Sequence, residues 1–343
     1  MKQSDPQPPM QLAATQSISV YRSRAFRVTE GANLGDAQAS MDELVLDDVY
    51  QLGDDASRHR LAIETLAEGG LRIAPDTETG RAGAPLHLDC ALTLMSPDGR
   101  HTEALVLVEV DELWLIAEVY LLPLAPLAPR TDYRLVGIDR AAARRRFAEV
   151  ACVSFTRGTR ITMATGAQVP IEDLEIGDRV LTRDDGPQQV RWIGRGTVRA
   201  SGEFAPIVIR AGTLNNQGDL VVSPNHRLFV YQRRDEINAG RPELLVRASH
   251  LINGDSVTVR EGGFVDYFQL LFDSHHIIYA EGIAAESMLI DPRTRPALPA
   301  ELLDRLGALL PGHDASGLKG LDVQKALLDR PDAIDLLRRA SLR

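Results

Sequence analysis

Short apolar runs separated by turn residues dominate the first part of the chain. Between about residue 17 and residue 138 the runs are "ELVLDDVYQL", "LHLDCALTLM", "ALVLVEV" and "LWLIAEVYLL", with turn chemistry such as Pro97-Asp98-Gly99 between them. Runs of this length, bounded by such turns, are typical of β-strands. They predict a small antiparallel β domain over residues 17–138. The Pro-, Gln- and Ser-rich residues 1–16 predict a disordered segment.

The strand pattern ends in the proline-rich stretch "LPLAPLAPRTDY". Proline removes a backbone donor from a sheet and fixes φ, so a linker is expected here. The following segment "DRAAARRRFAEVA" has the composition of a helix, and Asp139 stands where an N-cap residue is preferred. Residues 139–153 are therefore predicted to be a helix and linker that lead into a second domain.

Short strands and glycine turns return from Ser154 to about Ile290, together with an internal repeat. The segments "LEIGDRVLTR" (174–183) and "LINGDSVTVR" (251–260) agree at five of ten positions. The repeat predicts two similar β units related by a pseudo-two-fold axis, with Val180 and Val257 in equivalent places. A chance agreement of two Gly-Asp turns is the alternative. Residues 291–343 contain apolar positions at helical spacing, in "ALPAELLDRLGALL" and "LDVQKALLDRPDAIDLLRRASLR", and predict a helical appendage.

Composition limits the classes of partner. The 343 residues are enough for two domains, and the net charge of −10 argues against a nucleic-acid partner, which needs a clustered basic surface. Cys90 and Cys152 are too few for a disulfide framework and form no zinc-type pair. Since the chain shows no secretory signal and no apolar stretch near 18 residues, we expect no membrane partner and a cytoplasmic location by default. Export without a recognisable signal is left open.

Several polar residues in the second domain are candidates for chemistry. Ser154 follows Cys152 by two positions in "ACVSFTRGTRI", just before the turn at Gly158 and Thr159. A Ser-Pro-Asn-His sequence lies at 223–226, and Asp-Ser-His-His at 273–276. Histidine suits proton transfer because its pKa is near neutrality. The plainer interpretation is that these are buried residues satisfied by carbonyl groups, with Cys152 acting as a small hydrophobic residue. No phosphate loop is present, and consecutive strand residues such as His275 and His276 point to opposite faces, so we expect no cofactor or metal.

The order of these features resembles the Hint domain of hedgehog proteins and inteins. The segments "SFTRGTRI", "VPIEDLEIGDRVLTRDDGPQQVRWIG", "IVIRAGTL", "LVVSPNHRLFV" and "YFQLLFDSHHIIYAEGIAAESML" closely resemble the bacterial Hint subfamily. The resemblance spans residues 154–290. It implies a mainly β fold, a Hint disc with a pseudo-two-fold repeat, preceded by the small β domain and followed by terminal helices.

The resemblance also implies a mechanism. The side chain of the first domain residue, Ser154, would attack the carbonyl of Val153 and convert the peptide bond into an ester. His226 matches the family's T-x-x-H histidine, with Ser223 in the Thr place, and would bind the scissile amide nitrogen and act as general acid. His275 matches the later histidine, and His276 is the alternative in register. These residues, with Thr159 and Cys152, are the candidate catalytic site.

Three departures from the family change the expected outcome. Gln269 occupies the place of a late Asp, so one member of a proton relay is replaced. Glu286 and Ser287 stand where splicing inteins end in His-Asn, which makes splicing unexpected. Most relatives carry Cys at the position of Ser154, and a hydroxyl is the weaker nucleophile.

Two functions from different classes remain open after these departures. The first is single-turnover autoprocessing, in which the substrate is the chain's own amino-terminal segment and the acceptor is water or an external nucleophile. The second is an inert Hint scaffold with a structural or interaction role. A conventional Ser-His hydrolase is weaker, because the chain lacks a Gly-x-Ser-x-Gly elbow.

Overall fold

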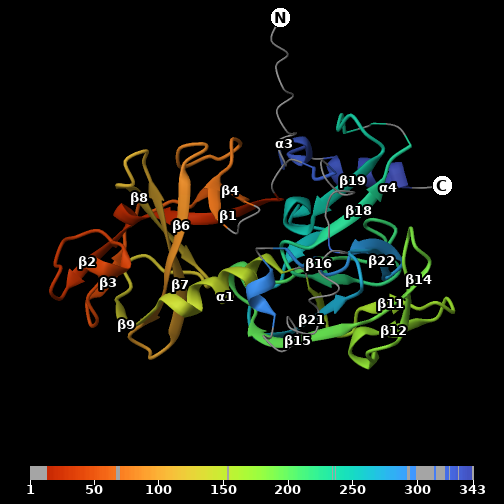
Figure 1. The fold of residues 1–343 in the computed structure, drawn as a ribbon, viewed down its shortest axis with the longest axis horizontal. Coiled ribbons are helices and arrows are strands. Elements are labelled where there is room, and N and C mark those ends of the chain that lie inside the picture. The colour runs from red at the N-terminus through yellow and green to blue at the C-terminus, as the bar shows by residue number, and fades with distance from the viewer. Residues whose placement is uncertain are drawn as a thin grey trace, which may run out of the picture.

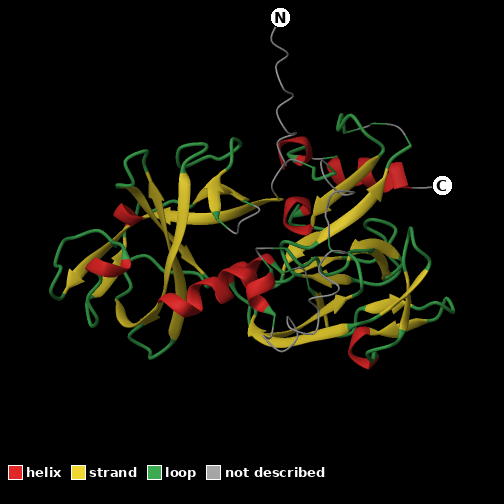
Figure 2. Cartoon of the chain, in the orientation of Figure 1, coloured by secondary structure: helices red, strands yellow, loops and turns green. Residues whose placement is uncertain are grey.

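Two β domains joined by one helix make up the part of the chain that can be described (Figures 1 and 2). The computed structural model describes residues 14–66, 70–152, 154–233, 235, 237–291, 294–298, 313, 321–323, 325–330 and 332–341. Within these residues, the strands of the amino-terminal domain are β1 (Ala14–Arg22), β2 (Phe26–Glu30), β3 (Val49–Leu52), β4 (His59–Thr65), β5 (Leu71–Ile73), β6 (Pro85–Met95), β7 (His101–Val110), β8 (Ile116–Pro123) and β9 (Tyr133–Asp139). Two 3-10 helices, η1 (Ser23–Ala25) and η2 (Met41–Glu43), lie between them.

The nine strands form one antiparallel sheet in the order β2-β3-β9-β6-β5-β4-β1-β8-β7. An additional pairing of β6 with β7 closes β1 and β4–β8 into a ring. The predicted antiparallel β domain is therefore present. Its first strand begins at Ala14, so the last three residues of the segment expected to be disordered are paired instead, for example Gln16 with Ile63. Residues 1–13 lie outside the described residues.

Strand β7 explains why the domain has two hydrophobic clusters. All residues from 104 to 110 are buried, as the mostly apolar sequence of this strand suggests. Because successive side chains of a strand point to opposite faces, Val106 and Val108 enter one cluster while Leu105 and Leu107 enter the other. A strand buried on both faces positions the sheet between two packed layers.

Helix α1 (Arg140–Ala151) connects the domains, and the helix prediction is confirmed. The Asp139 side chain accepts a hydrogen bond of 2.9 Å from the amide of Ala142, which satisfies one unpaired donor of the first turn. Phe147 packs into the core of the amino-terminal domain. Cys152 is the C-cap of this helix, and β10 begins only at Phe155, so Cys152 and Ser154 do not belong to one strand.

The second domain contains many short strands in three sheets. They are β10 (Phe155–Thr156), β11 (Arg160–Thr162), β12 (Gln168–Pro170), β13 (Arg179–Leu181), β14 (Pro187–Gln189), β15 (Trp192–Arg199), β16 (Ile207–Ile209), β17 (Leu220–Val222), β18 (Arg227–Tyr231), β19 (Glu243–Arg247), β20 (Val257–Val259), β21 (Phe264–Leu271), β22 (Ile277–Ala280) and β23 (Ile283–Glu286). The sheet orders are β15-β21-β10-β17-β16-β20, β12-β11-β22-β23-β18-β19 and β13-β14. The mainly β prediction is confirmed.

The two repeated segments adopt the same local sequence of structures. Each follows a 3-10 helix, η3 (Ile171–Asp173) or η5 (Ala248–Leu251), and each enters its strand through a glycine with positive φ, +101° at Gly177 and +76° at Gly254. Val180 and Val257 are both fully buried in the same core. Their strands have different partners, since β13 pairs with β14 and β20 pairs with β16.

The two domains also touch directly. The 3-10 helix η4 (Gly202–Phe204) places Phe204 against the core of the amino-terminal domain. Gly202 has φ +54°, and a Cβ at this position would lie 2.7 Å from the carbonyl oxygen of Leu124. Only a glycine permits this approach of the two backbones.

The carboxyl-terminal segment is part of the second domain's core. Helices α3 (Lys325–Leu328) and α4 (Ala333–Ser341) contribute Leu328, Leu336 and Leu337 to its hydrophobic cluster. The segment "ALPAELLDRLGALL" overlaps the 3-10 helix η6 (Arg295–Ala297) at one residue, and residues 299–310 of it lie outside the described residues. The described helices thus help to build the domain.

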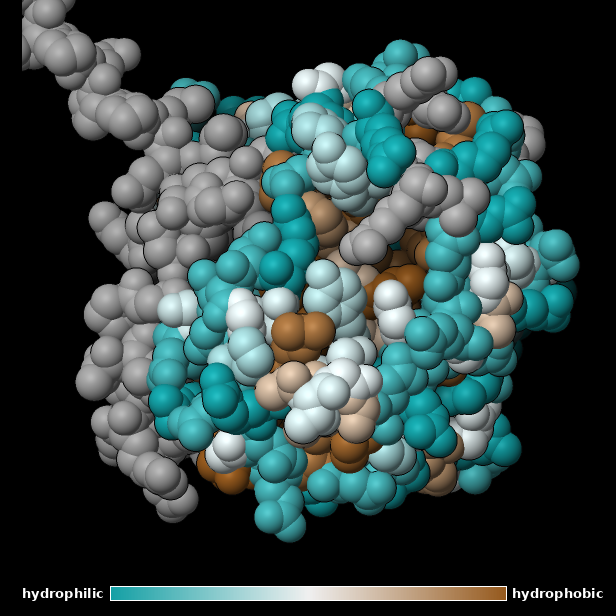
Figure 3. Space-filling view, turned by 90° about the vertical axis from the view of Figure 1, so that its right-hand side faces the viewer, coloured by the Kyte–Doolittle hydropathy of each residue, from teal (hydrophilic) through white to brown (hydrophobic). Residues whose placement is uncertain are grey.

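One face of the second domain is visible in a space-filling view. Figure 3 shows the face that lies at the right of Figure 1: it is mostly hydrophilic, and its apolar side chains form small separated groups. Among the described residues, no helix is both long and apolar enough to cross a membrane.

Replacing Leu337 by Ala tests the role of the carboxyl-terminal segment. Leu337 is fully buried, so the substitution leaves a cavity and should lower the free energy of unfolding by about 2–5 kcal/mol. Urea denaturation measures the change. The exposed neighbour Arg339→Ala is the control, with an expected change within about 0.5 kcal/mol. Equal stability of both variants would contradict the packing described here.

Candidate functional site

Ser154 lies where helix α1 gives way to the second domain. The next residue, Phe155, pairs with Val222 of β17 on one side and with Phe268 of β21 on the other. This central place in a six-stranded sheet buries Ser154, which is 4% exposed. The preceding residue, 153, lies outside the described residues. The structure thus positions the amide and side chain of the candidate nucleophile inside the domain.

Hydrogen bonds from the 223–226 turn hold the backbone of Ser154. The Ser154 amide donates to Ser223 Oγ at 3.0 Å, and the Ser154 carbonyl accepts from the Ser223 amide at 2.9 Å. His226 Nδ1 lies 3.2 Å from the same carbonyl oxygen. The Ser223 hydroxyl also donates to the carbonyl of Cys152 at 3.4 Å. Three sequence-predicted residues, Ser154, Ser223 and His226, are therefore brought together.

These contacts correct one detail of the sequence-based expectation. The amide nitrogen of Ser154, which was expected to contact His226, is bound by Ser223 instead. The reason is the tight turn at 223–226, in which the His226 amide donates to the Ser223 carbonyl at 3.0 Å and both side chains reach the same residue. Ser223 meets the nitrogen of Ser154, while His226 meets the oxygen on the other side of that residue.

Gln269 contacts the hydroxyl of Ser154. Its Nε2 donates to Ser154 Oγ at 3.2 Å from the neighbouring strand β21. Gly194, its partner in β15, makes room for it, since a Cβ there would lie 2.7 Å from Gln269 Oε1. An amide can orient a hydroxyl but cannot take its proton at neutral pH. Gln269, which replaces the family's late Asp, therefore contacts the hydroxyl of the candidate nucleophile.

His226 is completely buried, and burial lowers its pKa to about 4. Its ring packs against Phe155 with centroids 4.4 Å apart. A carbonyl oxygen can only accept, so Nδ1 carries the proton in the contact with Ser154. Nε2 makes no well-aligned hydrogen bond among the described residues and is the unprotonated nitrogen of the neutral ring, although a contact with the Glu286 backbone raises the pKa against the effect of burial. At neutral pH the ring is therefore uncharged, and it binds a proton less readily than an exposed imidazole does.

Arg227, the residue after His226, forms a buried ion pair with Glu286. The Arg227 guanidinium binds Glu286 with Nη2 2.6 Å from Oε2, and the Arg227 amide donates to Oε1 at 3.2 Å. Glu286 is fully buried; burial alone would raise its pKa, but the Arg227 guanidinium and the neighbouring His275 hold the pKa well below its usual range. His275 Nε2 lies 3.4 Å from Glu286 Oε2. His275 thus contacts Glu286. Among the described residues, it makes no direct hydrogen bond to Ser154.

The remaining candidates have other surroundings. His276 faces away from Glu286, with Nδ1 3.1 Å from Asp185 Oδ2. Thr159 is buried in the turn between β10 and β11, where its amide donates to the Thr156 carbonyl. Cys152 is 1% exposed and packs in an apolar cluster with Leu271 and Met288. Its surroundings are those of a small hydrophobic residue.

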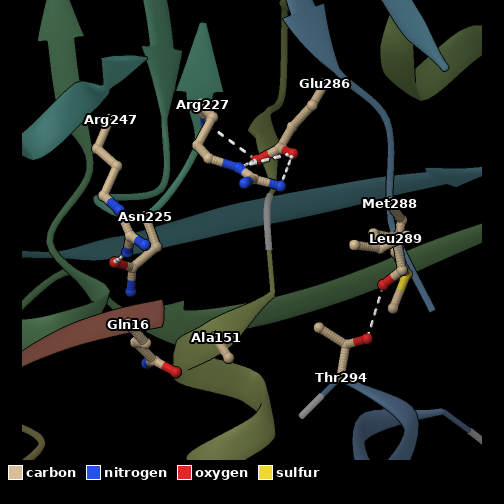
Figure 4. Close-up of a pocket in the computed structure, with 9 residues that line it drawn as sticks. All are labelled: Gln16, Ala151, Asn225, Arg227, Arg247, Glu286, Met288, Leu289 and Thr294. Carbon is tan, nitrogen blue, oxygen red and sulfur yellow. Dashed lines mark hydrogen bonds and ion pairs between the residues drawn. The ribbon is translucent and has the colours of Figure 1, made fainter. Parts of the chain in front are cut away.

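Sequence reasoning missed the Arg227–Glu286 pair and Asn225. Asn225 Nδ2 donates to the Val150 carbonyl at 2.9 Å and so ties the end of helix α1 to the 223–226 turn. Figure 4 shows these residues around the pocket that they line. A signal for the pair was present, because "NHRLFV" and "IAAESML" each place one charge in an apolar strand. Buried charges need partners, and that requirement could have linked the two strands.

The buried His226 should make stability depend on pH. In the unfolded chain its pKa is near 6.5, and in the folded protein it is about 4, so the unfolded state binds more protons between these values. Stability is therefore lost as pH falls from 6.5 to 4. His226→Gln should reduce the slope of unfolding free energy against pH by up to about 1.4 kcal/mol per unit in this window. Urea denaturation from pH 4 to 7 measures it, with exposed His101→Gln as control; equal slopes in wild type and His226→Gln would refute the assignment.

Comparison with known proteins identifies the second domain. The Hint domain family matches residues 153–292. A stretch of 86 residues is 33% identical to the catalytic polypeptide of the V-type proton ATPase of Candida tropicalis, and this match covers 24% of the present chain and 8% of that protein. Among solved structures, the DnaB intein from Synechocystis sp. PCC 6803 is 16% identical, with 39% of this chain and 98% of that chain covered and a TM-score of 0.29. The MchDnaB-1 intein is 13% identical, with 39% and 98% covered and a TM-score of 0.26. Residues 153–292 form a Hint domain, and the chain is a Hint domain-containing protein.

Proposed function

We propose that the Hint domain cleaves its own chain by an N-to-O acyl shift at the bond between residues 153 and 154. The observation that carries the proposal is the set of bonds on Ser154. Its amide donates to Ser223 Oγ at 3.0 Å, and its hydroxyl is held by Gln269 at 3.2 Å. The leaving nitrogen and the attacking oxygen of one residue are thereby both oriented.

The proposed reaction has two steps. Ser154 Oγ adds to the carbonyl carbon of residue 153, the carbon–nitrogen bond breaks, and the nitrogen takes the proton that the hydroxyl loses. This leaves an ester between residue 153 and Ser154 and a free amine on Ser154. An outside nucleophile then opens the ester and releases fragment 1–153. Amide resonance opposes the first step, so it requires assisted proton transfer.

His226 fits the role of the group that moves this proton. Because burial lowers its pKa to about 4, the ring is neutral at pH 7 and must accept a proton before it can deliver one. We propose that His226 acts first as base and then as acid, while Ser223 holds the nitrogen. The ion pair of Arg227 and Glu286 fixes the backbone next to His226 and is a positioning element.

Cleavage without splicing is the proposed outcome. Splicing needs an asparagine side chain that cyclises at the end of the domain, and Glu286 and Ser287 stand there in this chain. Glu286 is bound to Arg227, so its carboxylate is already occupied. The chain therefore has no internal route for rejoining its flanks.

The inert scaffold has one observation in its favour. Gln269 donates to Ser154 Oγ, and an amide at this place cannot remove the hydroxyl proton. If the His226 imidazole cannot reach that proton, the domain would serve only as a structural module that presents the amino-terminal domain.

Substitution of Ser154 separates the two functions. Ser154→Ala should abolish fragments 1–153 and 154–343, and Ser154→Cys should accelerate their formation, because a thiol is partly ionised near neutral pH. Cys152→Ala is the matched control and should leave the rate within about twofold. Intact-mass spectrometry with and without hydroxylamine follows the fragments. Cleavage lost in Cys152→Ala but kept in Ser154→Ala would make the thiol the nucleophile, and no cleavage in any variant would favour the scaffold.

Substitution of Ser223 tests its contact with the leaving nitrogen. Ser223→Ala removes the acceptor of the Ser154 amide and should slow cleavage at least tenfold, which corresponds to about 1.4 kcal/mol of barrier. Ser223→Thr keeps the hydroxyl and should restore most of the rate. Rates are best measured in the Ser154→Cys background, where cleavage is expected to be fastest. Equal rates for the Ala and Thr variants would remove Ser223 from the mechanism.

A further inference from the structure

A narrow pocket lies where the amino-terminal domain, helix α1 and the Hint domain meet (Figure 4). Gln16 enters it from β1, Ala151 from the end of α1, and Asn225, Arg247 and Thr294 from the Hint side. The pocket is therefore built by both fragments that the proposed cleavage would separate. We call it the Gln16 pocket.

Gln16 brings a buried polar side chain into this pocket. It is 2% exposed, and neither Oε1 nor Nε2 has a hydrogen-bond partner in the described part of the chain. Its neighbours are engaged elsewhere: Asn225 binds the Val150 carbonyl and accepts from Arg247 Nη1 at 3.3 Å. Leaving a buried amide unsatisfied costs about 1–3 kcal/mol. The Gln16 amide therefore favours a small ligand that both donates and accepts hydrogen bonds.

The size of the pocket limits that ligand. A water-sized sphere can occupy about 20 Å³ of it. A single water molecule needs roughly 10–15 Å³ measured in this way. A ligand of this size that donates and accepts hydrogen bonds is water.

The pocket also lies near the proposed reaction. Ala151 lines it and precedes residue 153 by two positions in the sequence, and Asn225 of the 223–226 turn lines it as well. Ser223, which binds the leaving nitrogen, also touches the carbonyl of Cys152. The Gln16 pocket thus adjoins the end of helix α1 and the turn that holds Ser154.

We propose that the Gln16 pocket binds the water molecule that hydrolyses the ester, so that water is the acceptor of the released acyl group. The inference rests on the proposed function. The water oxygen adds to the carbonyl carbon of residue 153, and the bond from that carbon to Ser154 Oγ breaks. Ser154 regains its hydroxyl proton from the water, and the second water proton leaves with the new carboxylic acid, which ionises. Gln16 acts as a positioning residue that orients the water and does not itself take a proton.

The test compares hydrolysis with trapping in one reaction. Full-length protein is incubated in H2(18)O with hydroxylamine, and the free acid and hydroxamate forms of fragment 1–153 are counted by mass. The free acid should carry one heavy oxygen. Gln16→Leu fills the pocket with an apolar group of similar size and should slow free-acid formation at least tenfold. Hydroxamate formation should change less than twofold, because concentrated hydroxylamine attacks without a positioning site.

A matched substitution and the remaining outcomes complete the test. Gln38→Leu alters another buried glutamine of the same domain and should change neither product. Equal loss of both products in Gln16→Leu would place Gln16 in the acyl shift or in folding and overturn the water site. An unchanged free-acid rate would also overturn it, with the proposed cleavage intact. No hydroxamate in any variant, Ser154→Cys included, would remove the proposed function and the water site together.

Discussion

The hydrogen bonds between Ser154 and the 223–226 turn are the constraint on which the candidate site depends. They join two segments about 70 positions apart in sequence, and they use both the amide and the carbonyl of Ser154. The pairing of β10 with β17 and β21 places these groups in the middle of a sheet, where water does not compete for them. Orientation of Ser154 is therefore built into the fold and does not require a flexible loop.

Burial and charge pairing shift the pKa values of ionisable groups near Ser154. Arg227 and Glu286 form a buried pair, and Arg227 Nη1 also lies 3.0 Å from Asp322 Oδ2 in the carboxyl-terminal segment. Replacement of one partner would leave an uncompensated charge, which commonly costs about 3–5 kcal/mol. The same burial lowers the pKa of His226 to about 4 and leaves its ring neutral. The charged Arg227 thus directly follows the neutral His226 in the sequence, and Asp322 of the carboxyl-terminal segment adds to the ion pair.

Contacts between the amino-terminal domain and the Hint domain lie beside the candidate site. Phe204 packs on the amino-terminal core, Gly202 approaches the Leu124 backbone, and Gln16 reaches the pocket beside helix α1. The fragment that cleavage would release is therefore packed against the domain that would release it. Separation of the two fragments requires these contacts to open after the bond is broken, which is a second reason to expect slow turnover in addition to the weak nucleophile.

The sequence alone determined the mainly β fold, the helix capped by Asp139 and the Hint resemblance, because periodicity, capping and motif order are local properties of the chain. It also selected Ser154, Ser223 and His226, which the fold brings together. The bacterial origin, the domain boundaries, the location and the acceptor stay predictions. The partner of the Ser154 amide depended on a turn about 70 residues away in the sequence. The sequence-based prediction for this partner was His226, whereas the structure has Ser223. The pairing of Arg227 with Glu286, the apolar surroundings of Cys152 and the unpaired Gln16 were decided only by tertiary structure, because burial and charge pairing depend on which distant strands become neighbours.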